Sequence, residues 1–377
     1  MHKEQLIQWP DLTVTASVRS FRPENGVAEH HAVIETKNRQ LSAEEQFQAV
    51  ETAAEHLQYL FPGCTPLFRR YFVSDAANQQ HFLKNGNGCV SVVQQPPLNG
   101  SKVCLWIYLA EGGDSSHSAG SCVWRHAGYS HIRHSGLQVP GADEFRATDT
   151  IFDRYARELA GYGCSLADHC IRTWIYVQGV DIHYAGMVRA RKAFFEKEGL
   201  TPATHFIAST GIEGKAVDPR SLVLMDAYAI HGISPEQIRY LQAPAHLNPT
   251  YEYGVTFERG TAVDYGDRRH VFISGTASID NKGEIVHPQE IAGQTERMFE
   301  NIGALLKEAE CSLEDVMQMI VYLRDTADAE KVGEYLEKSC SGIPYVLVWA
   351  PVCRPGWLVE AECMAVKAGK NTKFAPF

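Results

Sequence analysis

The chain has 377 residues, of which 45% are hydrophobic and 21% charged, and a formal net charge of −10 at pH 7. This length fits two or three modules, and the composition excludes a disordered chain. The acidic excess argues against a nucleic-acid partner, because phosphate-backbone binding requires an excess of Lys and Arg, but it is compatible with a small anionic ligand held by a local group of arginines.

Neither the first residues nor any later run is apolar enough for a signal peptide or a spanning helix, which predicts a cytoplasmic protein with no membrane partner. The ten cysteines include no Cys-x-x-Cys pair and mostly lie in apolar runs. Such a pattern is typical of reduced, buried thiols, so no disulfide framework is predicted.

The first third of the chain predicts an N-terminal extension over residues 1–27 and a degenerate repeat over residues 28–115. A capping box, Ser42-Ala43-Glu44-Glu45, opens an amphipathic helix. A strand over 71–73, a helical stretch after Ala76 and strands over 90–93 and 103–109 follow. Residues 94–100 contain Pro-Pro and Asn-Gly, which predicts a tight hairpin turn between adjacent strands.

The middle and last thirds share one pattern, and they predict a second repeat over residues 116–240 and a third over 241–377. Gly163–Asp168 (GCSLAD) and Glu310–Asp315 (ECSLED) occur at the same point of each. Helix-period segments precede them, over 151–159 and 298–305. Strands over 173–176 and 320–323, helices over 187–197 and 328–338, and two further apolar runs follow in both. Two polar stretches, 111–118 and 232–249, predict linkers.

The order helix, strand, helix, strand, strand therefore occurs three times along the chain. It predicts an α+β protein with three sheets, each carrying helices on one face. In the first third, where the match is loosest, the alternative is that short apolar runs only mimic a repeat.

The last third resembles the RidA (YjgF) superfamily, also called endoribonuclease L-PSP-like proteins. The matching stretches occur in family order over about a hundred residues: Val271-Phe272-Ile273-Ser274-Gly275, Gly283-Glu284, Gln294-Thr295, Asn301-Ile302, Ser312-Leu313 and Leu358-Val359-Glu360-Ala361-Glu362. Deaminating members carry an arginine directly after a Pro-Ala step to hold the substrate carboxylate. This chain has Ile343-Pro344-Tyr345-Val346 there, so the resemblance implies that the usual clamp is absent.

A closer resemblance is to the chorismatases, the fused-repeat relatives of that superfamily. It rests on Arg172-Thr173-Trp174-Ile175-Tyr176, on Tyr184 with Arg191 seven residues later, on Ser209-Thr210-Gly211-Ile212 and on Val352-Cys353-Arg354-Pro355-Gly356-Trp357-Leu358-Val359-Glu360. The family has Asn where this chain has Val188. The resemblance implies tandem RidA-like (chorismate-mutase-like) repeats around a pseudo-threefold axis.

The resemblance also implies a site. Chorismate carries two carboxylates and an enolpyruvyl ether, so cleavage needs cations for the carboxylates and an acid for the enol carbon. The implied catalytic residues are Glu360 and Cys353, and the implied substrate-binding residues are Arg354, Arg191, Tyr184, Arg172, Tyr176, Arg324 and Gly275. An apolar strand context should raise the pKa of Glu360. Cys353 resembles the branch that forms a hydroxybenzoate rather than a dihydrodiol.

Simpler interpretations exist for these residues. Alternating Glu360 and Glu362 are typical of a solvated strand face, and Cys353 of a small buried residue. Arg191 could lie on a hydrated helix face, and Arg172 and Arg324 in surface pairs. Our alignment of the copies places Leu224 and Cys104 where the third copy has Glu360, which predicts one asymmetric site.

Neither a metal nor a cofactor is predicted. His126, His131 and His134 form a cluster, but no Cys, Asp or Glu at ligand spacing completes a zinc set, and no nucleotide-binding glycine loop occurs. The leading hypothesis is a chorismatase-like enzyme, either a monomer with pseudo-trimeric repeats or a homo-oligomer. The alternatives are a RidA-like enamine or imine deaminase and a non-catalytic ligand-binding or scaffold protein.

Overall fold

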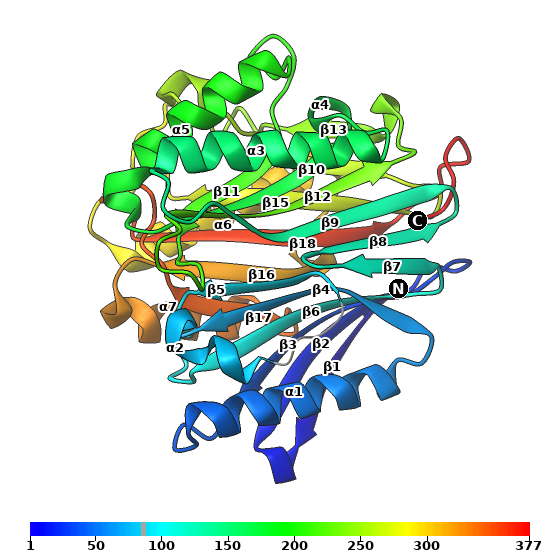
Figure 1. Cartoon of the computed structure of the whole chain (residues 1–377), viewed down its shortest axis with the longest axis vertical. Helices are drawn as coiled ribbons and strands as arrows, with labels where there is room; N and C mark the ends of the chain where they lie inside the picture. The colour runs from blue at the N-terminus through cyan, green and yellow to red at the C-terminus, as the bar shows by residue number, and fades with distance from the viewer. Residues whose placement is uncertain (84–87) are drawn as a thin grey trace.

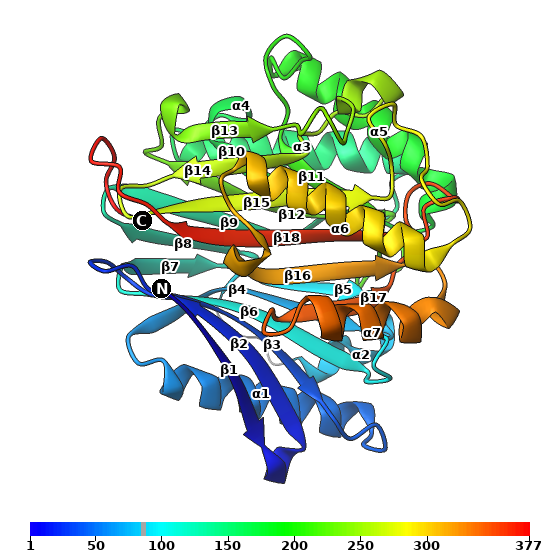
Figure 2. The ribbon, with the colours of Figure 1, turned by 180° about the vertical axis from the view of Figure 1, so that it is seen from behind.

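Three six-stranded sheets with helices on their outer surfaces make up the protein (Figures 1 and 2). The structure is a computed structural model that describes residues 1–83 and 88–377. Within these residues, no helix combines the length and the apolar character needed to cross a bilayer.

The first sheet has the order β1-β2-β3-β6-β4-β5. Its elements are β1 (His2–Trp9), η1 (Pro10–Leu12), β2 (Val14–Phe21), β3 (Glu29–Thr36), α1 (Ala43–Leu60), β4 (Cys64–Val73), α2 (Ala76–Gln79), η2 (Gln80–Phe82), β5 (Val90–Gln94) and β6 (Val103–Glu111). The predicted capping box is present: Glu45 N donates to Ser42 Oγ (3.2 Å), and Ser42 N donates to the Glu45 carboxylate (2.8 Å).

Residues 1–27 are part of this sheet and not an extension outside it. They supply β1 and β2, which pair with each other over their whole length, and β2 pairs with β3. The sequence gives little sign of β1 because this edge strand is largely solvent-exposed and carries no continuous apolar run. Such a strand is recognisable only once its partner is in place.

The hairpin predicted at residues 94–100 is wrong. β5 and β6 do not pair with each other, because both pair with β4, β5 in parallel and β6 antiparallel. Residues 96–98 instead contact β17 (Tyr345–Trp349) of the third sheet, where Leu98 N donates to Leu347 O (2.9 Å) and Trp349 N donates to Pro96 O (2.9 Å). A local turn pattern could not reveal a partner 250 residues away in sequence.

The second sheet has the order β11-β10-β12-β9-β8-β7. Its elements are β7 (Asp114–Ser118), β8 (Ser121–His126), β9 (Tyr129–Gln138), α3 (Glu144–Gly161), α4 (Leu166–His169), β10 (Cys170–Val177), α5 (Val180–Lys197), β11 (Ala208–Glu213) and β12 (Val223–His231). The linker predicted at 111–118 is wrong in its second half, because β7 is a fully exposed edge strand paired with β8. Its polar side chains face water, and backbone pairing alone makes it a strand.

The third sheet has the order β13-β14-β15-β18-β16-β17. Its elements are η3 (Pro235–Gln237), β13 (Ile238–Leu241), η4 (Thr250–Tyr253), β14 (Gly260–Asp264), β15 (Arg268–Ala277), α6 (Ile291–Glu308), η5 (Leu313–Asp315), β16 (Val316–Leu323), η6 (Thr326–Asp328), α7 (Ala329–Ser339), β17 and β18 (Val359–Ala368). The linker predicted at 232–249 thus contains η3 and β13.

The three sheets share one strand order, and each contains one parallel pair, β4/β5, β10/β11 or β16/β17. The tandem α+β repeats are therefore confirmed. The serines of the two repeated hexapeptides occupy equivalent caps, since Ser165 accepts from Asp168 N before β10 and Ser312 accepts from Glu314 N before β16. We propose that the repeats meet between β6 and β7 and between β12 and β13, so the predicted boundaries 115/116 and 240/241 fall inside β7 and β13.

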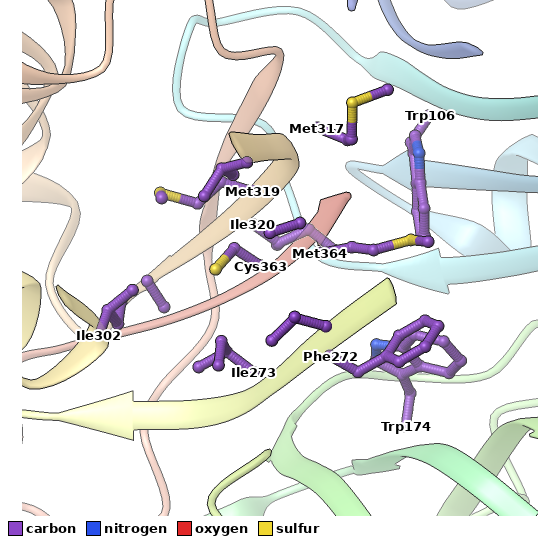
Figure 3. Close-up of a cluster of buried hydrophobic side chains, with 14 of the residues drawn as sticks. Trp106, Trp174, Phe272, Ile273, Ile302, Met317, Met319, Ile320, Cys363 and Met364 are labelled. Atoms are coloured by element: carbon purple, nitrogen blue, oxygen red, sulfur yellow. The ribbon is translucent and has the colours of Figure 1, made fainter. Parts of the chain in front are cut away.

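The inner faces of the sheets pack together in one core. Figure 3 shows Trp106 of the first sheet, Trp174 of the second and Phe272 and Met364 of the third in one buried cluster. Helix α1 covers the outer face of the first sheet, and α3 with α5 that of the second. With helices outside and sheets inside, the seams between sheets are the places where residues from two repeats meet.

Candidate functional site

A small pocket lies at the seam between the second and third sheets. Its walls come from both repeats, including the segment 242–259 between β13 and β14 of the third repeat. The lining residues are Tyr184, Arg191, Ser209, Gly211, Tyr253, Val255, Phe257, Arg259, Gly275, Ala277, Ile279, Cys353, Arg354, Trp357 and Glu360. Six of the nine predicted site residues are therefore together.

Glu360 is the only acidic residue in this lining. It lies on β18 between Ala277 of β15 and Tyr322 of β16, and is 4% exposed. Its carboxyl group accepts no hydrogen bond from any residue that the structure describes. Burial, and secondly the charge of Glu362, raise the pKa of Glu360 to about 8, against the opposing effect of Arg172 and Arg259. The side chain is therefore buried rather than part of a solvated strand face, and it holds a proton at neutral pH.

Gly275 makes room for this carboxyl group. A Cβ atom at position 275 would lie 2.1 Å from Glu360 Oε1, which no real structure tolerates, so glycine is required while Glu360 keeps this rotamer. Gly275 N donates to Thr210 Oγ1 of β11 (2.9 Å), which fixes the backbone of the third repeat against the second. The glycine at this position thus has a steric explanation, and its predicted contact with a substrate stays a prediction.

Helix α5 brings Tyr184 and Arg191 to the pocket from one face, because a spacing of seven residues is two helical turns. Arg191 is 1% exposed; its Nε donates to Thr256 Oγ1 (3.2 Å) and its Nη1 to Ser209 Oγ (3.5 Å), while Nη2 is buried without a partner. The Tyr184 hydroxyl lies beside the Cys353 thiol, and burial raises the pKa of that thiol to about 12. Cys353 is therefore a neutral wall of the pocket and not a thiolate nucleophile.

Two further arginines line the pocket, one of which the sequence did not indicate. Arg354 Nη2 donates to Tyr253 O (3.3 Å) and its guanidinium lies over the Tyr253 and Trp357 rings. Arg259, which we missed, donates to Asn248 O (2.8 Å) and lies over the Tyr253 and Phe257 rings. It lies just before a strand, outside the stretches that carry the family resemblance, and only its position beside the pocket identifies it.

None of Arg191, Arg259 and Arg354 forms an ion pair within residues 1–83 and 88–377. Since the one acid in the pocket is protonated near neutral pH, the pocket carries a net positive charge. Three guanidinium groups without acidic partners are suited to a ligand with carboxylate groups.

The other three predicted residues do not line the pocket. Arg172 forms a buried ion pair with Glu362 (2.8 Å), behind the pocket. Tyr176 lies in the central core, where its ring contacts the guanidinium of Arg70. Arg324 binds Asp181 at the surface, with Nη2 2.7 Å from Oδ1. On strand β10, the side chains of Arg172 and Tyr176 point into the core, and Arg324 binds the start of helix α5 instead of the pocket. Sequence proximity to the motifs could not show these directions.

The other two seams lack the acid, as the alignment of copies predicted. Leu224 and Cys104 occupy the positions equivalent to Glu360. Leu224 pairs with Tyr176 and Cys104 pairs with Phe72, just as Glu360 pairs with Tyr322. A larger cavity of about 610 Å³ lies at the seam of the first and third sheets, with Cys104 and Val346 in its lining. It has no equivalent of Glu360, so the acidic site is asymmetric.

The Tyr345-Val346 stretch, which lacks the deaminase arginine, also belongs to that other seam. The strand that borders the Glu360 pocket is β11. Its Thr210 is the equivalent of Val346 on β17, because Thr210 pairs with Trp174 in the same way as Val346 pairs with Ile320. An arginine is therefore missing from the clamp position at both seams.

The histidine cluster does not converge. His131 Nδ1 contacts Tyr228 Oη (2.7 Å), His134 Nε2 contacts Glu158 (2.9 Å) and His126 Nδ1 contacts Phe377 O (2.6 Å). Among the residues described, no group of three or more His, Cys, Asp or Glu side chains is arranged to hold a metal ion.

Comparison with known proteins gives relatives of two kinds. A family model described as Endoribonuclease L-PSP matches residues 261–367. A RutC family protein of Pyrococcus abyssi is 46% identical over 100 residues, which are 26% of this chain and 78% of that protein. A 2-iminobutanoate/2-iminopropanoate deaminase of Bos taurus is 28% identical over 133 residues, 35% of this chain and 89% of its own length.

The second kind is structural. A crystal structure of a chorismatase has a TM-score of 0.63 and 21% identity, covering 80% of this chain and 93% of that one. The resemblance to chorismatases is thus confirmed at the level of the fold. The family model matches the third repeat alone, whereas the structural similarity extends over most of the three-repeat architecture.

Proposed function

Because the chain belongs to the RutC family, within the RidA (YjgF) superfamily, and shares its fold with a chorismatase, we propose that it is an enzyme that cleaves the enolpyruvyl ether of chorismate. The products would be pyruvate and either a dihydrodiol or a hydroxybenzoate. One observation carries the proposal: Glu360, which is buried and whose pKa is raised to about 8, lines the same pocket as three arginines that form no ion pair with any residue in 1–83 or 88–377.

The first step is proton transfer from the Glu360 carboxyl group to the methylene carbon of the enolpyruvyl group. The π electrons of the carbon–carbon double bond form the new carbon–hydrogen bond, a carbon–carbon single bond remains, and the adjacent carbon becomes an oxocarbenium centre. Arg191, Arg259 and Arg354 hold the two substrate carboxylates in this step. No cofactor is needed, because the substrate already carries the electrons that accept the proton.

Capture of the oxocarbenium centre completes the reaction. Water adds to it and returns a proton to the Glu360 carboxylate, and the hemiketal then collapses to pyruvate as its hydroxyl proton passes to the departing ring oxygen of the dihydrodiol. Capture by the neighbouring ring hydroxyl, which also returns its proton to Glu360, gives a cyclic ketal instead; loss of a ring proton and cleavage of a ring carbon–oxygen bond then aromatise the ring, and pyruvate and a hydroxybenzoate leave. Cys353 and Gly275 border the reacting group and, in our proposal, help to determine which capture occurs.

Entry of the substrate requires a movement of the pocket wall. The pocket has a volume of about 20 Å³, room for about one water molecule, and a ring with two carboxylates does not fit. The segment 242–259 supplies Tyr253, Val255, Phe257 and Arg259 to the lining, and in our proposal it is the wall that moves. Two residues of this segment have left-handed backbone, Ala243 (φ 49°) and Gly254 (φ 86°), and in our proposal the glycine, which follows η4, is the pivot about which this wall opens.

The test is pyruvate release from chorismate by the purified full chain, with Glu360→Gln as the control. We expect the substitution to lower the rate by about 10²- to 10⁴-fold, the usual contribution of a general acid, with binding of chorismate retained. Release of pyruvate at the same low rate by both proteins would contradict the proposal.

The deaminase alternative is tested in parallel by ammonia release from an enamine intermediate. The deaminase relative of Bos taurus favours it, whereas Thr210 and Val346 at the clamp positions oppose it. If ammonia release is accelerated and no pyruvate is released, the protein is a deaminase and not a chorismate-cleaving enzyme. If neither activity is found, the result favours a ligand-binding or scaffold role.

A further inference from the structure

A second buried acid, Glu362, lies behind the pocket on the same face of β18 as Glu360. Residues two apart on a strand point to the same side, about 7 Å apart along the backbone. Glu362 is 3% exposed and is not part of the pocket lining. Its hydrogen-bond partners hold it behind the lining, so its effect on the site is expected to act through Glu360.

Glu362 is surrounded by hydrogen-bond donors. Its Oε2 accepts from Arg172 Nη2 (2.8 Å) and from Thr210 Oγ1, and its Oε1 accepts from Trp174 Nε1 (2.6 Å). Both oxygens thus accept, and one donor is a cation. This is the environment of a charged carboxylate rather than of a carboxylic acid.

Glu360 has the opposite environment. Its carboxyl group has no donor among the described residues, and the charged groups that act on it are Glu362 from its own strand, Arg172 from β10 and Arg259 from the segment before β14. Arg172 is already bound to Glu362, and Arg259 donates to Asn248. A fixed negative charge nearby disfavours ionisation of a second buried carboxyl group.

The seam between the first and second sheets contains a natural control. Asp226 of β12 pairs with Trp174 as Glu362 pairs with Ile320, and it accepts from Arg70 Nη2 (2.9 Å), Ser91 Oγ (2.6 Å) and Gly136 N (2.9 Å). Two residues before Asp226 stands Leu224, not an acid. Both seams therefore use a buried carboxylate to join two repeats, but only Glu362 has a second acid beside it.

We propose that Glu362 is a positioning residue whose carboxylate, fixed by Arg172, Trp174 and Thr210, keeps the neighbouring Glu360 carboxyl group protonated for proton transfer. The role rests on the proposed function. It goes beyond joining the repeats, which Glu362 shares with Asp226.

The test compares Glu362→Gln with Asp226→Asn in the full chain. Glutamine removes the charge, but its NH2 group cannot accept, so it keeps the hydrogen bonds to one of the two carboxylate oxygens only; Asp226→Asn suffers the same loss and is therefore the matched control. We expect Glu362→Gln to move the alkaline limb of the pH profile of kcat to lower pH by about one unit or more, which is about a tenfold loss of rate on that limb. Asp226→Asn should leave the limb in place, although both variants lower the melting temperature.

A second measurement does not depend on turnover. The infrared carbonyl band of a protonated carboxylic acid that disappears in Glu360→Gln reports the titration of Glu360 directly. Its midpoint should fall in Glu362→Gln and not in Asp226→Asn, whether or not chorismate is the substrate. Equal midpoints in wild type and Glu362→Gln, or equal displacement by both substitutions, would overturn the proposal; absence of pyruvate with a displaced band would overturn only the proposed reaction.

Discussion

At the scale of single residues, whether a buried carboxyl group is ionised depends on whether the fold provides it with hydrogen-bond donors. Glu360 and Glu362 stand two positions apart on one strand, yet Glu362 accepts three hydrogen bonds and Glu360 none from the described residues. The alternation of acids on an apolar strand predicted that they share a face. It could not predict the donors, since Arg172, Trp174 and Thr210 come from a different repeat.

The raised pKa of Glu360 predicts a specific dependence of stability on pH. Between its ordinary value of 4.5 and the folded value of about 8, the native state holds a proton that the unfolded chain has lost. The free energy of unfolding should therefore fall as pH rises through this window, by up to ~1.4 kcal/mol per pH unit from this one group.

Glu360→Gln should lack this contribution, so its stability relative to wild type should rise with pH across the same window. Denaturant unfolding at several pH values measures the difference, with exposed Glu196 of α5 replaced by Gln as the control for loss of a surface carboxyl. A difference between Glu360→Gln and wild type that stays constant with pH would show that Glu360 is ionised in the folded protein.

At the scale of elements, helix α5 does most to bring the second repeat into the site. Glu213 at the end of β11 accepts from Gly179 N (3.1 Å) and Val180 N (2.7 Å), so a carboxylate caps the helix start. From that fixed start, Tyr184 and Arg191 face the pocket. The spacing of apolar residues predicted the helix. The sequence could not show that the face with Tyr184 and Arg191 points to the pocket, because this depends on how the helix packs on the sheet.

Two arginines associated with α5 provide a matched pair of variants. Arg191→Met removes a buried guanidinium that has a free Nη2 facing the pocket, so kcat/KM for chorismate should fall by about 10- to 100-fold, the value of a charge-assisted hydrogen bond. Arg324→Met removes the ion pair with exposed Asp181 and a hydrogen bond to Val352 O, both outside the pocket lining, and should change kcat/KM by less than about threefold. Steady-state kinetics decide, and a larger effect of Arg324→Met would contradict the pocket described above.

At the scale of the whole molecule, every seam contains one buried arginine–carboxylate pair. Arg70 and Asp226 join the first and second repeats, Arg172 and Glu362 the second and third, and Arg268 and Glu29 the third and first (2.6 Å). Such pairs cost desolvation, but each fixes the position of one sheet against the next. The pseudo-threefold assembly is thus specified at all three seams, and only one of them became the acidic site.

Arg70 allows this joining role to be measured away from the site. It is fully buried, and its guanidinium lies over the rings of Phe68, Trp106, Trp174 and Tyr176. Arg70→Met leaves Asp226 buried without its cation, so the free energy of unfolding should fall by about 3 to 5 kcal/mol. Calorimetry should detect the loss, while the midpoint of the Glu360 titration stays unchanged; an unaltered melting temperature would contradict the role.

The sequence by itself determined the repeated architecture and which of the three repeats carries an acid at this strand position. The evidence for both was local: helix periods, the repeated Cys-Ser-Leu step and the position of Glu360 relative to Leu224 and Cys104. Local patterns of this kind do not depend on how the sheets pack against one another. The tertiary structure alone decided which residues meet. Arg172 and Glu362 are 190 residues apart, and the exposed strands β1 and β7 have no apolar signature, because seam contacts and edge pairing depend on packing between repeats rather than on neighbouring sequence. For that reason only the fold revealed Arg259 in the pocket lining and Glu362 behind it, and it showed that Arg172, Tyr176 and Arg324 lie outside the lining.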